Sequence, residues 1–281
     1  MKVLVTGSSG RIGGTIAARL KLRHEVTGLD RRPGPVTNEL ADVEDTARLA
    51  TLLAGQDAVV HTASLHVPDL ASSSRAAFQA VNVDATRRLL EAAGAAGVGR
   101  FVYTSTTSLY GDAMLPSGGA AAWVEESLTP QPRDVYDETK LAAEEACRAA
   151  ARSGLPCTSL RVARCFPEEP RLVAIYRLYR GVDPEDVAQA HELALAAERG
   201  GFEVYNVSAP TPFRPEDCRR LYEDAASLLL ERYPWVRSEF AARAWQLPRS
   251  IDRVYVVDKA IAGLGYRPRH DFVALVKRPA G

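Results

Sequence analysis

Tyr136 and Lys140 stand four residues apart in the stretch YDETK, at the start of an alanine-rich segment. In a helix, this spacing places both side chains on one face. A free phenol is a poor base at neutral pH, but a nearby ammonium and a cationic nicotinamide ring favour its ionised form. We therefore expect Tyr136 to accept a proton from a substrate hydroxyl while the same carbon loses a hydride, with Lys140 also holding the nicotinamide ribose.

Three glycines, Gly7, Gly10 and Gly13, lie between a short apolar run and a helical pattern in VTGSSGRIGGTIAARL. Glycine allows the backbone to approach a pyrophosphate, and a helix N-terminus offers free N–H groups and the positive end of its dipole. Asp30 ends the second predicted strand, where a carboxylate can bind the adenosine ribose hydroxyls. This pattern predicts a dinucleotide site and favours NAD over NADP, because a carboxylate repels a 2′-phosphate. The two arginines that follow Asp30 would soften that preference.

Two further stretches carry polar groups that fit such a site. Asp42, in ADVED, can reach the adenine amino group or, alternatively, cap a helix over Val43–Ala50. A hydroxyl in FVYTSTTSLYG, at the end of another predicted strand, would bond the substrate oxygen and stabilise charge on it. Cys165 lies near the expected nicotinamide position, and we interpret it as a packing residue.

Strands and helices alternate in the first half of the chain, which is typical of parallel βαβ units. The predicted strands are Val3–Thr6, Glu25–Leu29, Ala58–Ala63, Arg100–Ser105, Pro156–Val162 and Val204–Val207. The predicted helices are Ile12–Leu22, Thr46–Ala54, Phe78–Gly97, Tyr136–Ala151 and Asp183–Arg199, with residues 215–245 mostly helical and 111–133 a loop that covers something. The pattern predicts an α/β fold, a Rossmann-type doubly wound parallel sheet with a small C-terminal substrate-binding lobe. We expect residues 1–165 to form the NAD-binding domain and residues 166–281 the smaller lobe, interleaved with the sheet.

Composition narrows the function classes. The 281 residues carry 35 basic and 35 acidic side chains, so no net field favours nucleic acid or an anionic membrane. No apolar run approaches the roughly 20 residues that span a bilayer. The four cysteines show no metal-ligand spacing, which indicates reduced thiols, no metal and a cytoplasmic location.

Several stretches, in order along the chain, resemble the extended short-chain dehydrogenases/reductases of the NAD-dependent epimerase/dehydratase type. They include VTGSSGRIG, AVVHTAS, VNVDATRRLLEAA, RFVYTSTTSLYG, YDETKLAAEE and GVDPEDVAQAHELAL. The resemblance implies that Thr106, Tyr136 and Lys140 are catalytic, with the last two also touching NAD. It implies cofactor contacts at Gly7, Gly10, Arg11, Ile12, Gly13, Asp30, Asp42, Val43 and Ala63. It also implies a structural role for Asn82 and a homodimer formed through the helices around 78–97 and 136–151.

The chain departs from nucleotide-sugar enzymes of this family after LRVARCFPEEP. Only residues 171–180 separate Pro170 from GVDPEDVA, so most of the expected diphosphate-binding segment is absent. This short form resembles the uronate dehydrogenases, which implies substrate contacts from Ser64, His66, Thr106 and Arg164 and a carboxylate clamp by Arg171. His66 and Arg171 are equally compatible with solvated surface side chains.

The main hypothesis is therefore an NAD-dependent dehydrogenase of a small sugar or sugar acid, with a carbohydrate as its small-molecule partner. The alternatives are a nucleotide-sugar epimerase or dehydratase with a shortened lobe and a non-catalytic dinucleotide sensor. Residues 231–250, ERYPWVRSEFAARAWQLPRS, have no counterpart in the uronate enzymes; we expect a structural helix, a dimer contact or part of a substrate wall there.

Overall fold

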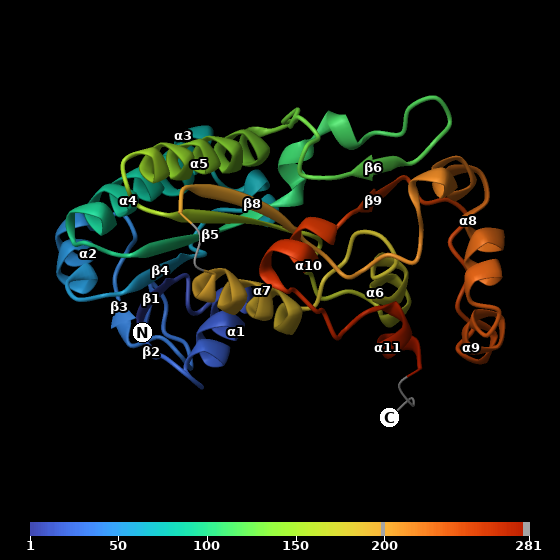
Figure 1. The fold of residues 1–281 in the computed structure, drawn as a ribbon, viewed down its shortest axis with the longest axis horizontal. Helices are drawn as coiled ribbons and strands as arrows, with labels where there is room; N and C mark the ends of the chain where they lie inside the picture. The colour runs from blue at the N-terminus through green and yellow to red at the C-terminus, as the bar shows by residue number, and fades with distance from the viewer. Residues whose placement is uncertain (198–199, 278–281) are drawn as a thin grey trace.

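The computed structural model describes residues 1–197 and 200–277, and a seven-stranded sheet forms its centre (Figure 1). All neighbouring strands run parallel, in the order β3-β2-β1-β4-β5-β7-β8. Their bounds are β1 (Lys2–Thr6), β2 (Glu25–Asp30), β3 (Glu39–Leu40), β4 (Ala58–His61), β5 (Arg100–Thr106), β7 (Cys157–Val162) and β8 (Phe202–Val207). The order reverses between β1 and β4, which is the switch point of a doubly wound sheet. The predicted fold class is confirmed, and within this large sheet only the two-residue β3 was not predicted.

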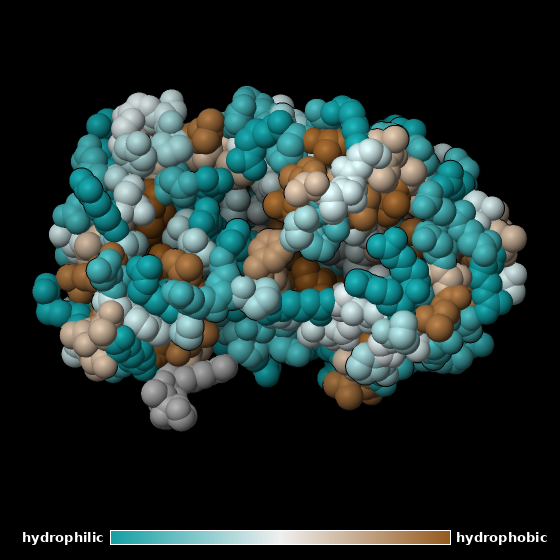
Figure 2. Space-filling view, turned by 180° about the vertical axis from the view of Figure 1, so that it is seen from behind, coloured by the Kyte–Doolittle hydropathy of each residue, from teal (hydrophilic) through white to brown (hydrophobic). Residues whose placement is uncertain are grey.

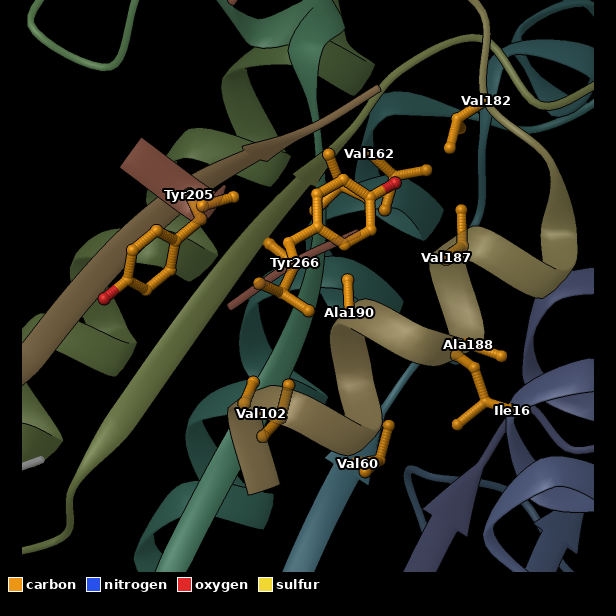
Figure 3. Close-up of a cluster of buried hydrophobic side chains, with 14 of the residues drawn as sticks. Ile16, Val60, Val102, Val162, Val182, Val187, Ala188, Ala190, Tyr205 and Tyr266 are labelled. Carbon is orange, nitrogen blue, oxygen red and sulfur yellow. The ribbon is translucent and has the colours of Figure 1, made fainter. Parts of the chain in front are cut away.

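Helices cover both faces of this sheet, because alternate residues of its apolar strands point to opposite sides. One face carries α1 (Arg11–Leu20), α7 (Pro184–Ala196) and α10 (Asp258–Leu264). The other carries α2 (Thr46–Leu53), α4 (Ala85–Ala95) and α5 (Val135–Arg152). Figure 3 shows Val187 and Ala190 of α7 in the same buried cluster as Val60 and Val102 of the sheet. The predicted end of α7 at Arg199 lies outside the described residues.

The segment predicted as one helix over Phe78–Gly97 is not continuous. It contains α3 (Arg75–Phe78), a π-helical stretch η2 (Gln79–Asp84) and then α4. Within η2, the Asn82 amide accepts a hydrogen bond from Leu65 N at 2.8 Å and donates to Leu65 O at 2.9 Å. It also donates to Thr139 Oγ1 on α5 at 3.1 Å. The wider turn thus ties the loop after β4 to the catalytic helix, in line with the structural role expected for Asn82.

Residues 111–133 are not only a loop. They contain a short turn of helix, η4 (Asp112–Met114), and the strand β6 (Ala122–Val124). β6 pairs in parallel with β9 (Arg253–Tyr255), so a small second sheet joins two segments that are far apart in the sequence (Figure 1). This pairing brings the C-terminal part of the chain toward the carboxyl edge of the large sheet.

The C-terminal lobe lies at one end of the elongated molecule (Figure 1). It consists of α6 (Pro170–Tyr176), α8 (Cys218–Arg232), α9 (Val236–Ala242) and α11 (Phe272–Val276), together with β9. An apolar cluster with stacked Tyr233, Trp235 and Phe272 rings holds it together. The helical character predicted for residues 215–245 is confirmed. Residues 166–281 also include β8, a strand of the large sheet, and α7, which packs on one face of that sheet. The domain boundary at residue 165 therefore stays a prediction.

On the face shown in Figure 2, hydrophobic residues are interspersed with hydrophilic ones. Among the described residues, no helix is both long and apolar enough to cross a membrane. All four cysteines are free.

Candidate active site

A cavity of about 760 Å³ opens at the carboxyl edge of the large sheet. Its walls come from the segments that follow β1, β2, β4, β5 and β7, from the start of α5 and from the small sheet. The predicted residues that line it are Gly7, Gly10, Arg11, Ile12, Gly13, Asp30, Asp42, Val43, Ala63, Ser64, His66, Thr106, Tyr136, Lys140 and Arg164. Fifteen residues chosen from motifs along 160 positions thus meet at one cavity, and Arg171 is the one predicted site residue outside it.

The glycine turn after β1 leaves no room for side chains. Gly7 has a φ of +73°, and a Cβ at this position would lie 2.5 Å from Thr62 Oγ1. A Cβ at Gly13 would lie 2.1 Å from the Gly7 carbonyl oxygen. Gly10 caps α1 with no side-chain hydrogen bond, so the first N–H groups of the helix remain available beside the cavity. This cradle fits the pyrophosphate of a dinucleotide.

Two carboxylates line the same end of the cavity. Asp30 accepts hydrogen bonds from Ser9 N and Arg32 N, each at 3.0 Å, which fixes its side chain at the end of β2. Asp42 accepts one from Glu44 N at 3.0 Å. The alternative that Asp42 caps the next helix is wrong, because α2 begins after Asp45, whose side chain accepts from Arg48 N. Asp42 therefore remains available to a ligand, and its adenine contact stays a prediction.

The residues predicted to be catalytic come together where β5 meets the start of α5. Asp134 caps α5 by accepting a hydrogen bond from Asp137 N at 2.9 Å, which places Tyr136 in the first turn. The Tyr136 phenol bonds the side chain of Thr106, the last residue of β5. Lys140 Nζ donates to Thr104 O at 2.7 Å. Phenol, hydroxyl and amine therefore face one part of the cavity from two neighbouring elements.

The ionisation of this group differs from the expectation. Burial raises the pKa of Tyr136 to about 12, and its hydrogen bond with Thr106 only partly opposes this shift. Burial also lowers the pKa of Lys140 to about 7, against the opposing charge of Glu144 one turn further along α5. Desolvation thus outweighs the stabilisation of phenolate that the Tyr–Lys spacing predicts. In the protein alone, the phenol is protonated at neutral pH.

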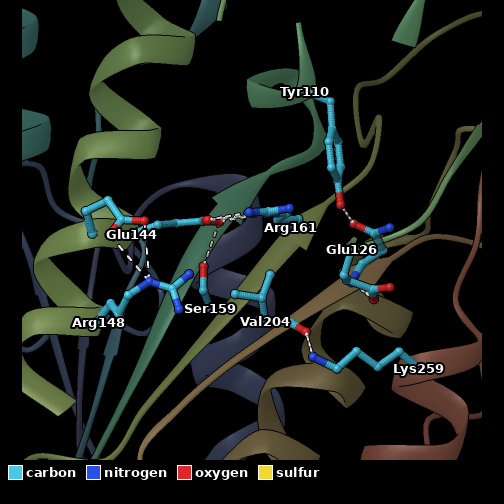
Figure 4. Close-up of polar contacts among 10 residues, drawn as sticks. Tyr110, Glu126, Glu144, Arg148, Ser159, Arg161, Val204 and Lys259 are labelled. Atoms are coloured by element: carbon cyan, nitrogen blue, oxygen red, sulfur yellow. Dashed lines mark hydrogen bonds and ion pairs between the residues drawn. The ribbon is translucent and has the colours of Figure 1, made fainter. Parts of the chain in front are cut away.

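A buried polar network fastens α5 to the sheet behind the catalytic group (Figure 4). Arg161 of β7 forms an ion pair with Glu144 of α5 at 2.8 Å, and Ser159 Oγ donates to Glu144 at 2.9 Å. Tyr110 OH donates to Asn206 Oδ1 of β8 at 2.8 Å. Breaking such a buried pair by removing one partner leaves an uncompensated charge, so the network holds α5 in one position on β7.

The substrate end differs from the prediction in one residue. Arg164 lines the cavity but is ion-paired with Glu168, with Nε 3.0 Å from the carboxylate. The His66 and Phe166 rings both line the cavity and form a tilted pair, with centroids 6.5 Å apart. Arg171 lies on α6 and does not line the cavity, so its position gives no support to a clamp there. Burial raises the pKa of the Cys165 thiol to about 11, which is consistent with a packing residue.

Several lining residues at this end were not predicted from the sequence, among them Met114, Arg133, Arg180, Arg253 and Tyr255. Two of them lie on β9, which its pairing with β6 and the hydrogen bond from Tyr255 N to Tyr179 O hold beside the cavity. The apolar, β-branched run VYVV around β9 was a usable strand signal. Residues 231–250 contribute none of the lining residues, which favours their interpretation as a structural element.

The comparisons with known proteins agree with this geometry. The model of the NAD dependent epimerase/dehydratase family matches residues 3–172. A 3-beta-hydroxysteroid dehydrogenase of Mycolicibacterium neoaurum is 35% identical over 159 residues, which cover 51% of this chain and only 42% of that protein. An L-arabinose 1-dehydrogenase (NAD(P)(+)) of Haloferax volcanii is 30% identical over 213 residues, or 70% of this chain and 83% of that protein. The solved structure of MoeE5 in complex with UDP-glucuronic acid and NAD is 25% identical, covers 98% of this chain and 96% of its own, and superposes with a TM-score of 0.72.

Proposed function

This chain belongs to the NAD dependent epimerase/dehydratase family, and we propose that it oxidises a hydroxyl carbon of a sugar or sugar acid. Its cofactor is NAD. The observation that supports the reaction most directly is the position of Tyr136, Lys140 and Thr106 in the same cavity as the glycine turn. A dinucleotide bound along the turn would place its reactive end near these groups.

In this proposal, Gly7, Gly10 and Gly13 hold the pyrophosphate, with Arg11 and Ile12 at the start of α1 beside it. Asp30 binds the adenosine ribose, while Asp42, Val43 and Ala63 line the adenine and ribose walls. NAD supplies the hydride acceptor and a positive charge when bound.

In this proposal, Tyr136 accepts the proton of the substrate hydroxyl, and its neighbours affect how readily it does so. Its phenol must lose a proton before it can accept one from the substrate hydroxyl, and the raised pKa of about 12 opposes that loss. The bond from the Thr106 side chain favours the ionised phenol, and so does any positive charge that enters the cavity. Lys140, held by Thr104 O, stays on the same face of α5 and completes the site.

The charges that line the cavity argue against a dehydratase. Eliminating a hydroxyl group needs an acid to protonate it and a base to take a neighbouring proton. Among the described lining residues, the only carboxylates are Asp30 and Asp42, both at the cofactor end. The catalytic end therefore offers Tyr136 and Lys140 for proton transfer and no carboxyl group.

Two observations favour a dehydrogenase over a nucleotide-sugar epimerase. The segment between β7 and α7 contains only the short helix α6, so the wall that would surround a nucleotide is small. One of the relatives, the L-arabinose 1-dehydrogenase, is named for oxidation of a free sugar. We therefore favour net oxidation with release of NADH.

The test is to incubate the protein with NAD and a panel of free sugars, free uronates and UDP-sugars. Absorbance at the NADH band reports net oxidation, and chromatography of the sugar reports interconversion without net NADH. We expect stoichiometric NADH with a free sugar or uronate. Interconversion of a UDP-sugar without NADH would instead identify an epimerase. The homodimer and the cytoplasmic location remain predictions within this proposal.

A further inference from the structure

Four arginines surround the catalytic end of the cavity, and three of them already have carboxylate partners. Arg164 is paired with Glu168, Arg133 Nε lies 3.4 Å from Asp137, and Arg253 Nε lies 3.0 Å from Asp252. For Arg180, the structure gives no ion pair with any described residue. It is the one guanidinium in this part of the cavity wall whose charge the described protein does not balance.

The Arg180 side chain is held in place although it has no ionic partner. Its guanidinium carbon lies 4.2 Å from the ring centroid of Tyr176 and 5.4 Å from that of Tyr179. Arg180 N donates to Tyr176 O at 2.8 Å, and Arg180 O accepts from Arg164 N at 2.9 Å. A stacked guanidinium on a fixed backbone loses little further freedom when it binds a ligand.

One donor of this side chain is also unsatisfied. Arg180 Nε is buried and has no hydrogen-bond partner among the described residues. Leaving a buried donor unpaired is unfavourable, so such a group calls for a partner from outside the chain: a water, an ion or a ligand. No carboxylate of the described residues lines this end of the cavity, so the described protein supplies no negative charge there and a bound anion would.

We propose that Arg180 binds an anionic oxygen group of the substrate and thereby selects acidic over neutral sugars. This rests on the proposed function, because it concerns the substrate of the same site. The group is either the carboxylate of a free sugar acid or the diphosphate of a nucleotide sugar; both match the forked donors of a guanidinium. Arg180 thus takes the role of carboxylate clamp that was predicted for Arg171.

The test compares the wild type with Arg180→Gln, Arg180→Lys and the control Arg237→Gln, all loaded with NADH so that no bound sugar can be oxidised during the titration. Arg237 lies on α9, is exposed and is outside the cavity, so its replacement removes one positive charge without touching the site. The probes are glucuronate, glucose and UDP, and the readout is the dissociation constant from calorimetric titration. Glucuronate represents the carboxylate, UDP represents the diphosphate, and glucose is the neutral reference.

We expect wild type and Arg237→Gln to bind one of the two anions more tightly than glucose. Arg180→Gln should raise the dissociation constant of that anion by about 10- to 100-fold, which is typical of a lost charge-assisted hydrogen bond. Arg180→Lys should recover only part of this loss, because it keeps the charge but not the fork. Weak glucose binding should be the same in all four proteins.

Equal anion affinities in wild type and Arg180→Gln would overturn the assignment, as would no measurable binding of either anion by the wild type. The proposed function fails in a different way: anion binding would depend on Arg180, NAD would bind, and no sugar would yield NADH. Unchanged NAD affinity in Arg180→Gln shows that the variant is folded and that its loss is confined to the substrate end.

Discussion

The cofactor end of the cavity takes its wall from segments between Gly7 and Ala63, each directly after a strand of the large sheet. The substrate end draws on segments from Ser64 to Tyr255, including the small sheet that pairs β6 with β9. The two ends also differ in how they are filled. At the cofactor end, backbone atoms lie so close that two glycines have no space for a methyl group. At the substrate end, long arginine side chains stand over aromatic rings. The cofactor end thus takes its shape mainly from backbone atoms. The substrate end takes its shape mainly from side chains, which can differ from one protein to another without changing the cofactor end.

The largest effect is expected where the two ends meet. Tyr136→Phe removes the hydroxyl that we propose exchanges the proton and leaves the buried ring in place. Proton transfer by a positioned group contributes about 10²–10⁴ in rate, so we expect kcat to fall by that factor. Steady-state NADH formation measures it, with NAD affinity as the control.

A small loss of kcat in Tyr136→Phe would show that another group handles the proton. NAD affinity should change little, because the cradle around the pyrophosphate lies in the glycine turn. A large loss of NAD affinity would mean that the two ends are not separable at this residue.

The division between the ends explains which parts of the site the sequence predicts. A glycine turn, a strand-end carboxylate and a Tyr–Lys pair are local patterns, and the parallel sheet brings their strand ends to one edge whatever the rest of the chain does. Arg171 and Arg180 lie nine positions apart in one arginine-rich segment, and no local pattern tells which one faces the cavity. That depends on where α6 ends and on the contact of Arg164 with residues 180 and 181, which is long-range.

The fold shows the same limit. Strands with several buried apolar residues were predicted to within about two residues, whereas β3, β6 and β9 have only two or three residues each. Such strands exist because a partner strand is in place. The break at η2 has a similar cause, since Asn82 bonds Leu65 and Thr139, which lie 17 and 57 positions away. The spacing of apolar residues does not predict hydrogen bonds between a polar side chain and residues far away in the sequence.

A second variant tests whether the cofactor end depends on close backbone packing. In Gly13→Ala, the new Cβ would lie 2.1 Å from Gly7 O and 2.6 Å from Thr62 Oγ1, so the turn must shift. Strain of this kind costs about 1–3 kcal/mol, and we expect NAD affinity to fall by roughly 10- to 100-fold. Titration of NAD by calorimetry measures it.

Gly94→Ala is the matched control, because Gly94 is a helical glycine of α4 whose added Cβ would meet nothing within 4 Å. It should leave NAD affinity unchanged and raise stability by about 0.5–1 kcal/mol, since glycine costs that much in a helix. If both variants bind NAD as the wild type does, the turn is not the pyrophosphate site.

The last expected effect is on stability and not on rate or binding, and it concerns Lys140, which lines the cavity where the two ends meet. Burial lowers its pKa from 10.5 to about 7 in the folded protein, so between these values the unfolded chain holds a proton that the folded chain does not. The free energy of unfolding therefore rises with pH across this window, by at most about 1.4 kcal/mol per pH unit, and the full penalty applies below pH 7. Lys140→Met removes the titrating group together with its bond to Thr104 O. The total gain between pH 6.5 and 9.5 is at most about 3 kcal/mol. At about 2–4 °C per kcal/mol, we expect the melting temperature of the wild type, relative to this variant, to rise by up to roughly 6–12 °C over this range.

The hydrogen bond lost in Lys140→Met lowers its melting temperature equally at every pH. The titration of Lys140 is therefore measured by how the difference in melting temperature between wild type and variant changes with pH. Tyr136 does not interfere, since its pKa is raised from 10 to about 12 and it titrates above this range in both proteins. A difference that stays constant from pH 6.5 to 9.5 would mean that Lys140 keeps its charge when the protein folds. The amine would then be hydrated, and the cavity would be open to water at the point where hydride and proton must be transferred. A melting-temperature difference that rises with pH would instead show that Lys140 loses its charge on folding. Burying the amine between the two ends of the cavity would then cost stability at low pH.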